Sequence, residues 1–590
     1  MRTHFMKTGM AAIVALALLH SCKKDGNTNT NGGGKNNGGT DGGPTVITLP
    51  NNPDIAATQG FFLDGWQPKT FGIPATYKTV AKPVAGSVVA TVDLSKVITK
   101  VSKNLFGNNT NPFMGQYVDQ PVLMQQLTDL SPNILRFPGG SLSDIYFWNG
   151  SNKAPDDAPA QLLDNAGTSS ASNYWYGNNT ADWTFTLDNY YKVLQQTNST
   201  GLITVNYGYA RYGTSDNPVE AAAQLAADWV RYDKGRTKYW EIGNENYGNW
   251  EAGYRINPAA NKDGQPAILS GALYGLHFKI FADAMRKAAA EVGNTGIKIG
   301  MVTTEADEKD NTSTIIQSWN ADAMATSGNS PDFYVVHNYY TPYMQNSSPE
   351  VILGTPVGVT TNMMNWVKNS LQKAGLQQKP VALDEWNIFS AGSKQMVSNV
   401  AGVHAVMVLG ELIKNQYSMA SRWDLANAWD NGDDHGLFNN SVNSSNKEPG
   451  APAWNARPAF YYMYFFQKYF GDRMVTSEVT GSPDIFSYGS SFESGGAGVV
   501  LVNRSGLDRT VTVNLKNFAA GTKYYYYTLN GGTDNAPFSR KVYVNGTGPD
   551  GDSGGPATYK TIAANSAAIS GGIIVTVPAR GTVFLVAEGK

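Results

Sequence analysis

Two short segments of the chain each place a glutamate after a run of apolar residues. Residues 239–245 read Tyr-Trp-Glu-Ile-Gly-Asn-Glu, and residues 380–387 read Pro-Val-Ala-Leu-Asp-Glu-Trp-Asn. Each run predicts a short buried strand ending in a glutamate, and the carboxyl ends of strands are where a (β/α)8 barrel places its chemistry. Two carboxylates facing one another are the minimum machinery for cleaving a glycosidic bond. Glu245 and Glu385 are therefore the candidate catalytic pair, although either one alone would be interpreted as a surface glutamate.

The two glutamates need opposite protonation states for such a reaction. One gives a proton to the departing oxygen and the other stays ionised, so their surroundings must separate their pKa values. Glu245 is the candidate acid, because its apolar neighbours favour the neutral form of a carboxyl group. Glu385 is the candidate nucleophile, and Arg136 is expected to reach across the barrel mouth and keep it ionised; a structural ion pair is the alternative for Arg136. Asn244 is expected to point into the same cleft and bind a sugar hydroxyl next to the reacting carbon.

Strand-like apolar runs alternate with amphipathic helical stretches between about residues 102 and 471. This alternation predicts an α/β fold, a (β/α)8 TIM barrel, with helices over 220–232, 274–292, 362–374 and 399–415. The expected buried face of the second helix consists of Leu276, Phe278, Ile280, Phe281 and Met285. The eight expected strands cover residues 104–107, 133–137, 202–206, 238–242, 297–301, 333–337, 380–384 and 419–423.

The pattern changes after residue 471. Short β-rich runs separated by turn residues, such as 498–503, 510–515, 523–528 and 582–587, predict a C-terminal antiparallel β-sandwich over residues 472–590. The strand-like residues 49–101 are expected to pack on the barrel or to join the sandwich. The catalytic barrel is thus expected to span residues 102–471.

The first 48 residues are expected to be a targeting segment and a tether. Residues 1–21 have a basic start and an apolar run too short to span a bilayer, and Leu-His-Ser-Cys at 19–22 resembles the lipobox of bacterial lipoproteins. Cys22, the only cysteine, is the expected lipidation site and sole membrane attachment; a plain secretory signal is the alternative. Residues 22–48, rich in Gly and Asn, predict a flexible tether. The expected location is the cell envelope, on the outer membrane, after secretion across the inner membrane.

The composition and the motifs of the chain indicate which kinds of molecule it is expected to bind. The formal net charge of −2, from 45 basic and 47 acidic side chains, gives no electrostatic case for nucleic acid or an anionic membrane surface. An aromatic content of 11% would serve stacking on the faces of a polysaccharide or oligosaccharide. The sequence has no phosphate loop, dinucleotide fingerprint or HExxH motif, so no cofactor and no metal are expected. Asp430, Asp433, Asp434 and His435 form the one candidate metal cluster, for which a solvated loop is the favoured interpretation.

Motifs at four places carry a specific resemblance. They are Arg-Phe-Pro-Gly-Gly (136–140), Trp-Glu-Ile-Gly-Asn-Glu (240–245), Val-His-Asn-Tyr-Tyr (336–340) and Asp-Glu-Trp-Asn (384–387). Together they resemble the clan A glycoside hydrolases, most of all the α-L-arabinofuranosidases of family 51, over roughly residues 100–590. The resemblance implies that Glu245 ends strand 4 as acid/base and that Glu385 ends strand 7 as nucleophile of a retaining reaction. It also implies that Tyr339 of strand 6 lies near the nucleophile, with His337 on the same face.

The departures from the family 51 pattern concern the sugar pocket. Ser141 stands where the family usually has Asn, and residues 106–111, Phe-Gly-Asn-Asn-Thr-Asn, lack its sugar-binding Glu. Strand 8 reads Arg-Trp-Asp-Leu at 422–425 instead of a Gln-containing segment, and Trp423 suits a sugar-stacking platform. An endo-acting glycanase, or another clan A glycosidase of xylosidase or glucanase type, therefore stays open. A carbohydrate-binding lipoprotein without activity is the remaining alternative, although binding alone needs neither an acid nor a nucleophile.

Overall fold

The computed structural model describes residues 51–590 except residues 132, 308, 310, 441–446 and 533–535. The predicted signal peptide, the lipidation site Cys22 and the tether lie outside the described residues and stay predictions. Within the described part of the chain, no helix is both long enough and apolar enough to cross a bilayer.

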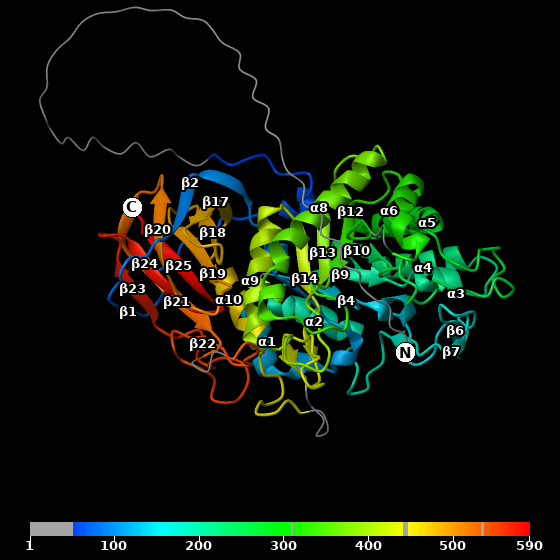
Figure 1. The fold of residues 1–590 in the computed structure, drawn as a ribbon. Coiled ribbons are helices and arrows are strands. Elements are labelled where there is room, and N and C mark those ends of the chain that lie inside the picture. Colours follow the sequence, from blue (N-terminus) through cyan, green and yellow to red (C-terminus); the bar gives the residue numbers. More distant parts are fainter. Residues whose placement is uncertain (1–50, 132, 308, 310, 441–446, 533–535) are drawn as a thin grey trace, which may run out of the picture. The chain divides into compact units, whose positions relative to one another are not determined.

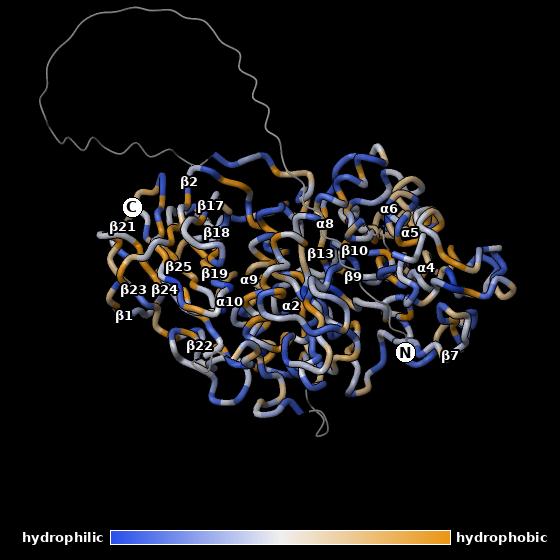
Figure 2. Tube along the Cα trace, in the orientation of Figure 1, coloured by the Kyte–Doolittle hydropathy of each residue, from blue (hydrophilic) through white to orange (hydrophobic). Residues whose placement is uncertain are grey.

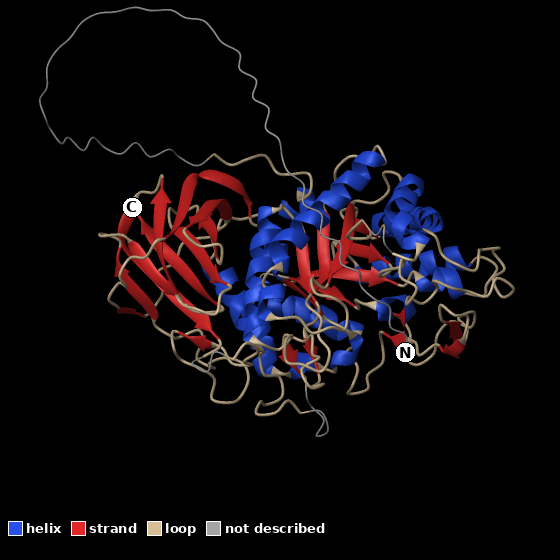
Figure 3. Cartoon of the chain, viewed as in Figure 1, coloured by secondary structure: helices blue, strands red, loops and turns tan. Residues whose placement is uncertain are grey.

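A closed barrel of eight parallel strands forms the centre of the described chain, and the predicted TIM barrel is confirmed (Figures 1 and 3). Its strands follow one another around the barrel in chain order, and each is joined to the next through at least one helix. Most strand residues are buried, as expected for a parallel sheet covered on its outer face. The strands are β3 (Gly107–Asn109), β4 (Ile134–Phe137), β9 (Thr200–Val205), β10 (Tyr239–Ile242), β11 (Lys298–Val302), β12 (Phe333–Asn338), β13 (Val381–Trp386) and β14 (Met419–Arg422).

Helices pack outside the barrel, and hydrophobic residues concentrate on the strands while the peripheral loops are mostly hydrophilic (Figure 2). The last two long helices differ from the others, because nearly every residue of α9 and the first nine residues of α10 are buried. The helices of the eight units are α1 (Pro121–Asp129), α2 (Leu187–Thr197), α4 (Pro218–Asp233), α5 (Gly271–Glu291), α6 (Thr314–Ser327), α8 (Thr355–Lys373), α9 (Asn399–Lys414) and α10 (Pro458–Tyr469), with the short additions α3 (Gly208–Tyr212) and α7 (Pro349–Ile352).

Two local expectations within the barrel were wrong. The predicted first strand at 104–107 is instead the 3-10 helix η2 (Lys103–Phe106), capped by the Ser102 hydroxyl, and β3 begins only at Gly107. In α5, Leu276 and Ile280 are 50% and 36% exposed, although Phe278 and Met285 are buried. At about 100° per residue, positions 276 and 280 lie on the side of the helix opposite positions 278 and 285.

The long loops of the barrel follow the carboxyl ends of its strands. The segment between β4 and α2 and the segment after β14 each form small two-stranded sheets of their own. Such loops are where this fold carries its function. These short elements are β5 (Tyr146–Phe147) with β8 (Trp175–Tyr176), β6 (Gln161–Leu163) with β7 (Ser169–Ala171), β15 (Ala426–Asn427) with β16 (Phe438–Asn439), and the 3-10 helices η3 (Pro112–Met114), η4 (Tyr117–Asp119) and η5 (Ser141–Ile145).

The second large unit of structure is an 11-stranded sheet with its own hydrophobic core. Most pairs are antiparallel, in agreement with the predicted sandwich, but β2 pairs with β20 and β1 with β23 in parallel, so the sheet is mixed. Both exceptions involve strands from before the barrel, and β2 inserts between β17 and β20. The strands are β1 (Tyr77–Thr79), β2 (Val88–Lys100), β17 (Arg473–Thr480), β18 (Ile485–Ser491), β19 (Ala497–Asn503), β20 (Arg509–Lys516), β21 (Ala520–Asn530), β22 (Tyr543–Val544), β23 (Ala564–Ala568), β24 (Ile573–Val577) and β25 (Gly581–Gly589).

The amino-terminal end of the barrel is closed by a short segment that precedes β1. The 3-10 helix η1 (Gly60–Leu63) places the ring of Phe62 4.4 Å from that of Tyr239 and 5.4 Å from that of Phe333. Tyr239 and Phe333 are the first residues of β10 and β12, so these rings form a plug at the end of the barrel where the strands begin. The strand-end glutamates lie at the opposite end of the barrel, where the strands finish.

We expect Phe62→Ala to lower the free energy of unfolding by about 3–5 kcal/mol, because it removes a buried ring and leaves a cavity. Urea denaturation followed by tryptophan fluorescence measures the change. Val84→Ala is the control, because Val84 is 90% exposed and its truncation should be close to neutral. Equal effects of the two substitutions would contradict the role of the aromatic plug.

Candidate active site

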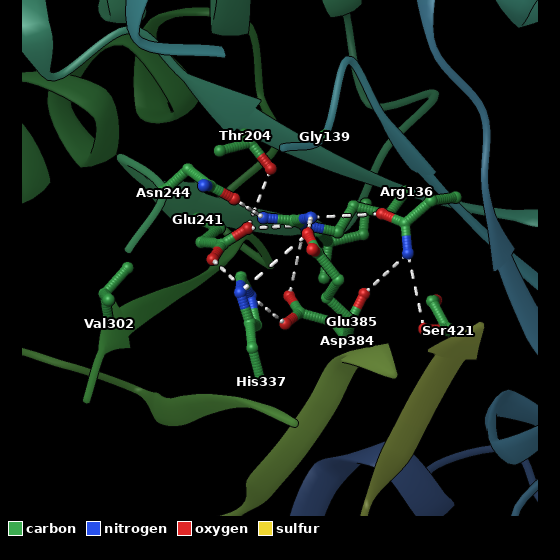
Figure 4. A network of polar contacts seen from close by, with 12 residues as sticks. Arg136, Gly139, Thr204, Glu241, Asn244, Val302, His337, Asp384, Glu385 and Ser421 are labelled. Atoms are coloured by element: carbon green, nitrogen blue, oxygen red, sulfur yellow. Dashed lines mark hydrogen bonds and ion pairs between the residues drawn. The ribbon is translucent and has the colours of Figure 1, made fainter. Parts of the chain in front are cut away.

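The guanidinium of Arg136, in β4, lies fully buried among carboxylates from β10 and β13 (Figure 4). Its Nε is 2.8 Å from Glu241 Oε2, and its Nη1 is 3.1 Å from Glu385 Oε2. Nε is also 3.5 Å from Asp384 Oδ2, and Nη2 donates to Asn244 Oδ1 at 2.8 Å. Burial opposes the charge of Arg136, but the three carboxylates outweigh it and raise its pKa. The expected contact with Glu385 is present, and the same cation is shared with two further acids.

Two glycines after β4 let the chain turn tightly beside this guanidinium. Gly139 and Gly140 have φ angles of +65° and +67°, a region that favours glycine. A Cβ on Gly139 would lie 2.8 Å from Asn109 Oδ1, the atom that accepts a hydrogen bond from Arg136 Nη1. A Cβ on Gly140 would lie 2.4 Å from the ring of Trp423. The predicted stacking residue Trp423 thus packs, half-buried, against this turn.

The cluster contains two acids, Glu241 and Asp384, that were not predicted as site residues. Glu241 is fully buried, and its Oε2 also accepts a hydrogen bond from Thr204 Oγ1 at 2.7 Å. Burial raises the pKa of Glu241 to about 7, although the charge of Arg136 opposes this. The sequence does carry a signal for Glu241, because an acid inside a wholly buried four-residue strand requires a buried cation as partner.

His337, in β12, lies between the two candidate catalytic glutamates. Its Nδ1 is 2.9 Å from Glu245 Oε1 and 3.8 Å from Glu385 Oε2. Its Nε2 is 3.1 Å from Asp384 Oδ1. Desolvation lowers the pKa of His337, but the charge of Glu385 and the contacts with Asp384 and Glu245 raise it well above its ordinary value. The surrounding carboxylates thus favour the protonated, cationic form of His337.

Glu385 lies within β13 and is oriented by Tyr339 as well as Arg136. The Tyr339 hydroxyl donates to Glu385 Oε1 at 2.6 Å, which is the contact that the family resemblance implies. The Tyr339 ring stacks on Phe389 with centroids 4.2 Å apart, and the ring of His435 lies 5.3 Å away. Burial raises the pKa of Glu385, and the charges of His337 and Arg136 only partly offset this. Arg136 lowers the pKa of Glu385 as expected, but burial and the charge of Glu245 raise it by more.

Glu245 lies three residues beyond the end of β10, in a loop and not at the strand end itself. It adopts a φ of +39°, an unfavourable conformation for a residue other than glycine and one found at functional sites. Its Oε2 accepts a hydrogen bond from Trp250 Nε1 at 3.0 Å. Burial opposes ionisation of Glu245, but the hydrogen bonds from His337 and Trp250 outweigh it and lower its pKa. We expected apolar neighbours to favour the neutral form of Glu245, and this was wrong. Trp250 turns its N–H and not its apolar ring towards the carboxylate.

The two candidate carboxylates reach one common space. One carboxylate oxygen of Glu245, one of Glu385 and a ring nitrogen of His337 lie within 4.8 Å of one another. The side chains of Glu245 and Glu385 are 17% and 7% exposed, whereas those of Glu241 and Asp384 have no exposed surface. Solvent therefore reaches the cluster at the two glutamates that the sequence singled out.

Asn244 lies behind this pair and connects Arg136 to a further buried acid. Its Nδ2 donates to Glu251 Oε1 at 3.0 Å, while its Oδ1 accepts from Arg136. Glu251, in the loop after β10, was not predicted, and neither was Asp144, whose Oδ2 accepts from Asn246 Nδ2 at 2.7 Å. Both acids follow glycine-containing loop stretches with few apolar residues, a pattern that is also common for surface acids.

The candidate metal cluster after β14 does not come together as ligands. Asp433 accepts hydrogen bonds from Ser390 Oγ and the Gly392 amide, and Asp434 accepts from the amides of Asp430 and Gly432. Asp434 is fully buried, so the solvated-loop interpretation is wrong for that residue. Within the described residues, two sets could converge on an ion, and both belong to the site above: Glu241, His337 and Asp384, and Glu245, His337 and Glu385.

Comparison with known proteins relates part of this cluster to a known family domain. Residues 126–348 match the family model of the alpha-L-arabinofuranosidase 1 domain. The resemblance to α-L-arabinofuranosidases is confirmed over these residues, which include Arg136, Glu245 and His337 but not Glu385. No curated protein matches the chain.

Solved glycosidases share the fold at low sequence identity. The α-L-arabinofuranosidase of Thermotoga maritima is 16% identical with a TM-score of 0.56, over 85% of this chain and 100% of that one. The family 51 α-L-arabinofuranosidase AbfB of Bifidobacterium longum is 14% identical with a TM-score of 0.58, over 86% and 100%. A family 44 xyloglucanase of Paenibacillus polymyxa is 12% identical with a TM-score of 0.53, over 85% and 99%. Both classes therefore share the barrel-plus-sandwich fold with this chain.

We expect His337→Gln to destabilise the protein most at mildly acidic pH. Because the folded-state pKa of His337 is raised, its contribution is fully present below the unfolded-state pKa of about 6.5 and is lost as the pH rises through the folded-state pKa. The loss of unfolding free energy should be about 3 kcal/mol at pH 6 and shrink steadily towards pH 9. Urea denaturation at pH 6, 7.5 and 9 measures the trend.

The matched control is His277→Gln. Burial lowers the pKa of His277 to about 4, so this residue is neutral in the folded protein over the same pH range. Its effect should not decrease between pH 7.5 and pH 9. A His337 effect that stayed constant or grew with pH would contradict the assignment of an imidazolium.

Proposed function

We propose that this chain is a retaining glycoside hydrolase that cleaves polysaccharides or oligosaccharides by double displacement, and that its activity is of the α-L-arabinofuranosidase type. The observation that carries the proposal is the approach of Glu245 and Glu385 to within 4.8 Å, oxygen to oxygen. Carboxyl groups about 5–5.5 Å apart leave room for a covalent glycosyl intermediate, whereas inverting enzymes need a wider gap for water. The arabinofuranosidase-type domain over residues 126–348 supports the same class.

Glu385 acts as the nucleophile in this proposal. Its Oε2 is 3.1 Å from Arg136 Nη1, and its Oε1 accepts from the Tyr339 hydroxyl, so both oxygens are fixed in direction. Attack of one oxygen on the anomeric carbon breaks the glycosidic bond and forms the glycosyl ester, and the hydrogen bonds prevent rotation of the carboxylate away from that carbon. Water then attacks the same carbon and releases Glu385 as a carboxylate.

Glu245 acts as the acid in the first step and the base in the second. In the free protein, the proton that it must donate resides on His337, whose Nδ1 is 2.9 Å from Glu245 Oε1. Transfer of this proton from His337 to Glu245 converts the pair of imidazolium and carboxylate into a pair of neutral imidazole and carboxylic acid. The number of protons in the pair does not change. A sugar between the two glutamates excludes water and disfavours the ion pair, which favours the neutral pair.

A second candidate is an endo-acting glycanase, and the aromatic rim favours it. Trp250 and Tyr343 are 55% and 73% exposed, and Tyr343 packs edge-on against Phe389 beside the nucleophile's tyrosine. Trp423 occupies the place of the Gln-containing segment of family 51, which suits a longer sugar chain.

A panel of aryl α-L-arabinofuranosides, xylosides, glucosides and galactosides, run beside intact arabinan, xylan and xyloglucan, separates the two candidates. Release of monomeric arabinose supports the first; a fall in polymer viscosity without monomer supports the second.

We expect Glu385→Ala to lower kcat on the preferred aryl glycoside by at least ~10⁴-fold, because the nucleophile is lost. Azide should restore part of the rate and give a glycosyl azide of inverted configuration, since azide attacks from the vacated face. Steady-state kinetics and NMR of the product measure both. The exposed Glu220→Ala variant should keep full activity. A Glu385→Ala variant as active as the wild type would contradict the nucleophile role of Glu385, and a wild type without activity on any substrate would leave only a carbohydrate-binding role.

We expect Glu245→Ala to slow substrates with poor leaving groups ~10²–10⁴-fold more than an activated 4-nitrophenyl glycoside. A good leaving group departs without protonation, so the first step then depends little on the acid. A series of aryl glycosides of rising phenol pKa gives the slope of log kcat/KM for the wild type and the variant. Equal losses across the series would contradict the acid role of Glu245.

A further inference from the structure

Glu251 is a buried acid whose carboxyl group contacts the site from behind. It lies in the loop after β10 and is 4% exposed. Its Oε1 accepts two hydrogen bonds, from Ser141 Oγ at 2.7 Å and from Asn244 Nδ2 at 3.0 Å. Its Oε2 is buried and has no hydrogen-bond partner among the described residues. Nothing in the proposed chemistry uses this carboxyl directly.

The Asn244 amide is held at both of its ends. A guanidinium only donates hydrogen bonds, so Arg136 Nη2, at 2.8 Å, requires the amide oxygen on its side. The amide nitrogen is then on the side of Glu251, and one of its two N–H groups donates to Oε1. Among the described residues Asn244 Nδ2 has no second acceptor, so the other N–H remains for a ligand.

Three segments distant in sequence meet through this amide. Ser141 follows the Pro-Gly-Gly turn after β4, and Glu251 and Asn244 come from the loop after β10. Asn244 contacts Arg136, which in turn contacts Glu385 in β13. Ser141 is one of the positions at which this chain departs from the family 51 pattern. Its hydroxyl donates to Glu251 in the structure, so the side chain at this position supports this acid.

We propose that Glu251 is a positioning residue that fixes the orientation of the Asn244 amide, so that the free N–H of Asn244 faces the sugar hydroxyl next to the reacting carbon. This inference rests on the proposed function, because it assigns the amide to that hydroxyl. Without the acceptor on Glu251, Asn244 retains only its contact with Arg136, and rotation about that contact moves the N–H away from the sugar. Hydrogen bonds to this hydroxyl strengthen in the transition state, so the loss should fall on kcat more than on KM.

The role needs an acceptor and not a charge. Burial and the nearby charges of Asp144 and Glu245 raise the pKa of Glu251 well above its usual value, against the hydrogen bonds from Ser141 and Asn244. The carbonyl oxygen of a neutral carboxyl group accepts the same two hydrogen bonds, and so does the oxygen of a glutamine amide. Glu251→Gln is therefore the conservative variant, and Glu251→Ala removes the acceptor.

The test compares 4-nitrophenyl α-L-arabinofuranoside with its 2-deoxy counterpart in each variant. In the wild type, removal of the 2-hydroxyl should lower kcat/KM by roughly 100-fold. In Glu251→Ala, kcat on the parent substrate should fall ~10–100-fold, and the 2-deoxy penalty should shrink to roughly 10-fold or less, because the hydrogen bond is already lost. Glu251→Gln should keep the full penalty, and Ser141→Ala should lie between the two.

Asp233→Ala is the matched control. Asp233 is a fully buried acid at the end of α4 whose Oδ2 accepts from the Thr237 amide, away from Asn244. Its removal should leave the 2-deoxy penalty at the wild-type value even where stability falls. If Glu251→Ala does not fold, the penalties of Glu251→Gln and Ser141→Ala still carry the test.

The outcomes separate this inference from the proposed function. A wild-type protein that hydrolyses neither an aryl glycoside nor a polysaccharide of the panel overturns the proposed function itself. An active wild type with an undiminished 2-deoxy penalty in Glu251→Ala overturns the positioning role alone. A Glu251→Gln variant as impaired as Glu251→Ala would overturn the acceptor argument.

Discussion

The ion cluster around Arg136 is the constraint on which the site depends. Its guanidinium and the imidazolium of His337 are the two buried cations among Glu241, Glu245, Asp384 and Glu385. A buried carboxylate is costly unless it is paired, and four of them around two cations leave the cluster short of positive charge. Protonation of the carboxyl groups therefore offsets part of the excess negative charge, as the raised pKa values of Glu241 and Glu385 indicate. The chemistry proposed for Glu245 uses a proton that this cluster already holds.

The barrel is what makes such a cluster possible. Parallel strands bring the ends of β4, β10, β12 and β13 to one face of the molecule, and the closed sheet keeps their spacing fixed. The aromatic plug of Phe62 and Tyr239 closes the other end with apolar contacts. Stability and chemistry thus lie at opposite ends of the same strands, and strain such as the positive φ of Glu245 is supported by the rigid strand before it.

Several features could be predicted from the sequence with good reason. The helical and strand periodicities are local properties, so the eight strand–helix units and the β-rich C-terminal part followed from spacing alone. The pairing of Arg136 with Glu385 followed from the positions of their strands once a barrel was assumed, and the pairing of Tyr339 with Glu385 followed from the family resemblance. Helix faces were less certain: Leu276 and Ile280 are apolar and yet exposed, because burial depends on what packs opposite a residue.

The sequence by itself determined the barrel, the identity of the two facing glutamates and the cation expected beside one of them, because strand ends of a parallel barrel converge whatever the loops do. Only the tertiary structure decided how the charges are shared. Arg136 serves three acids, Trp250 presents its N–H to Glu245, and Glu251 reaches Asn244 from behind. These contacts join loops and strands far apart in the chain, and the pKa of a carboxyl group depends on the distances and burial that such contacts create.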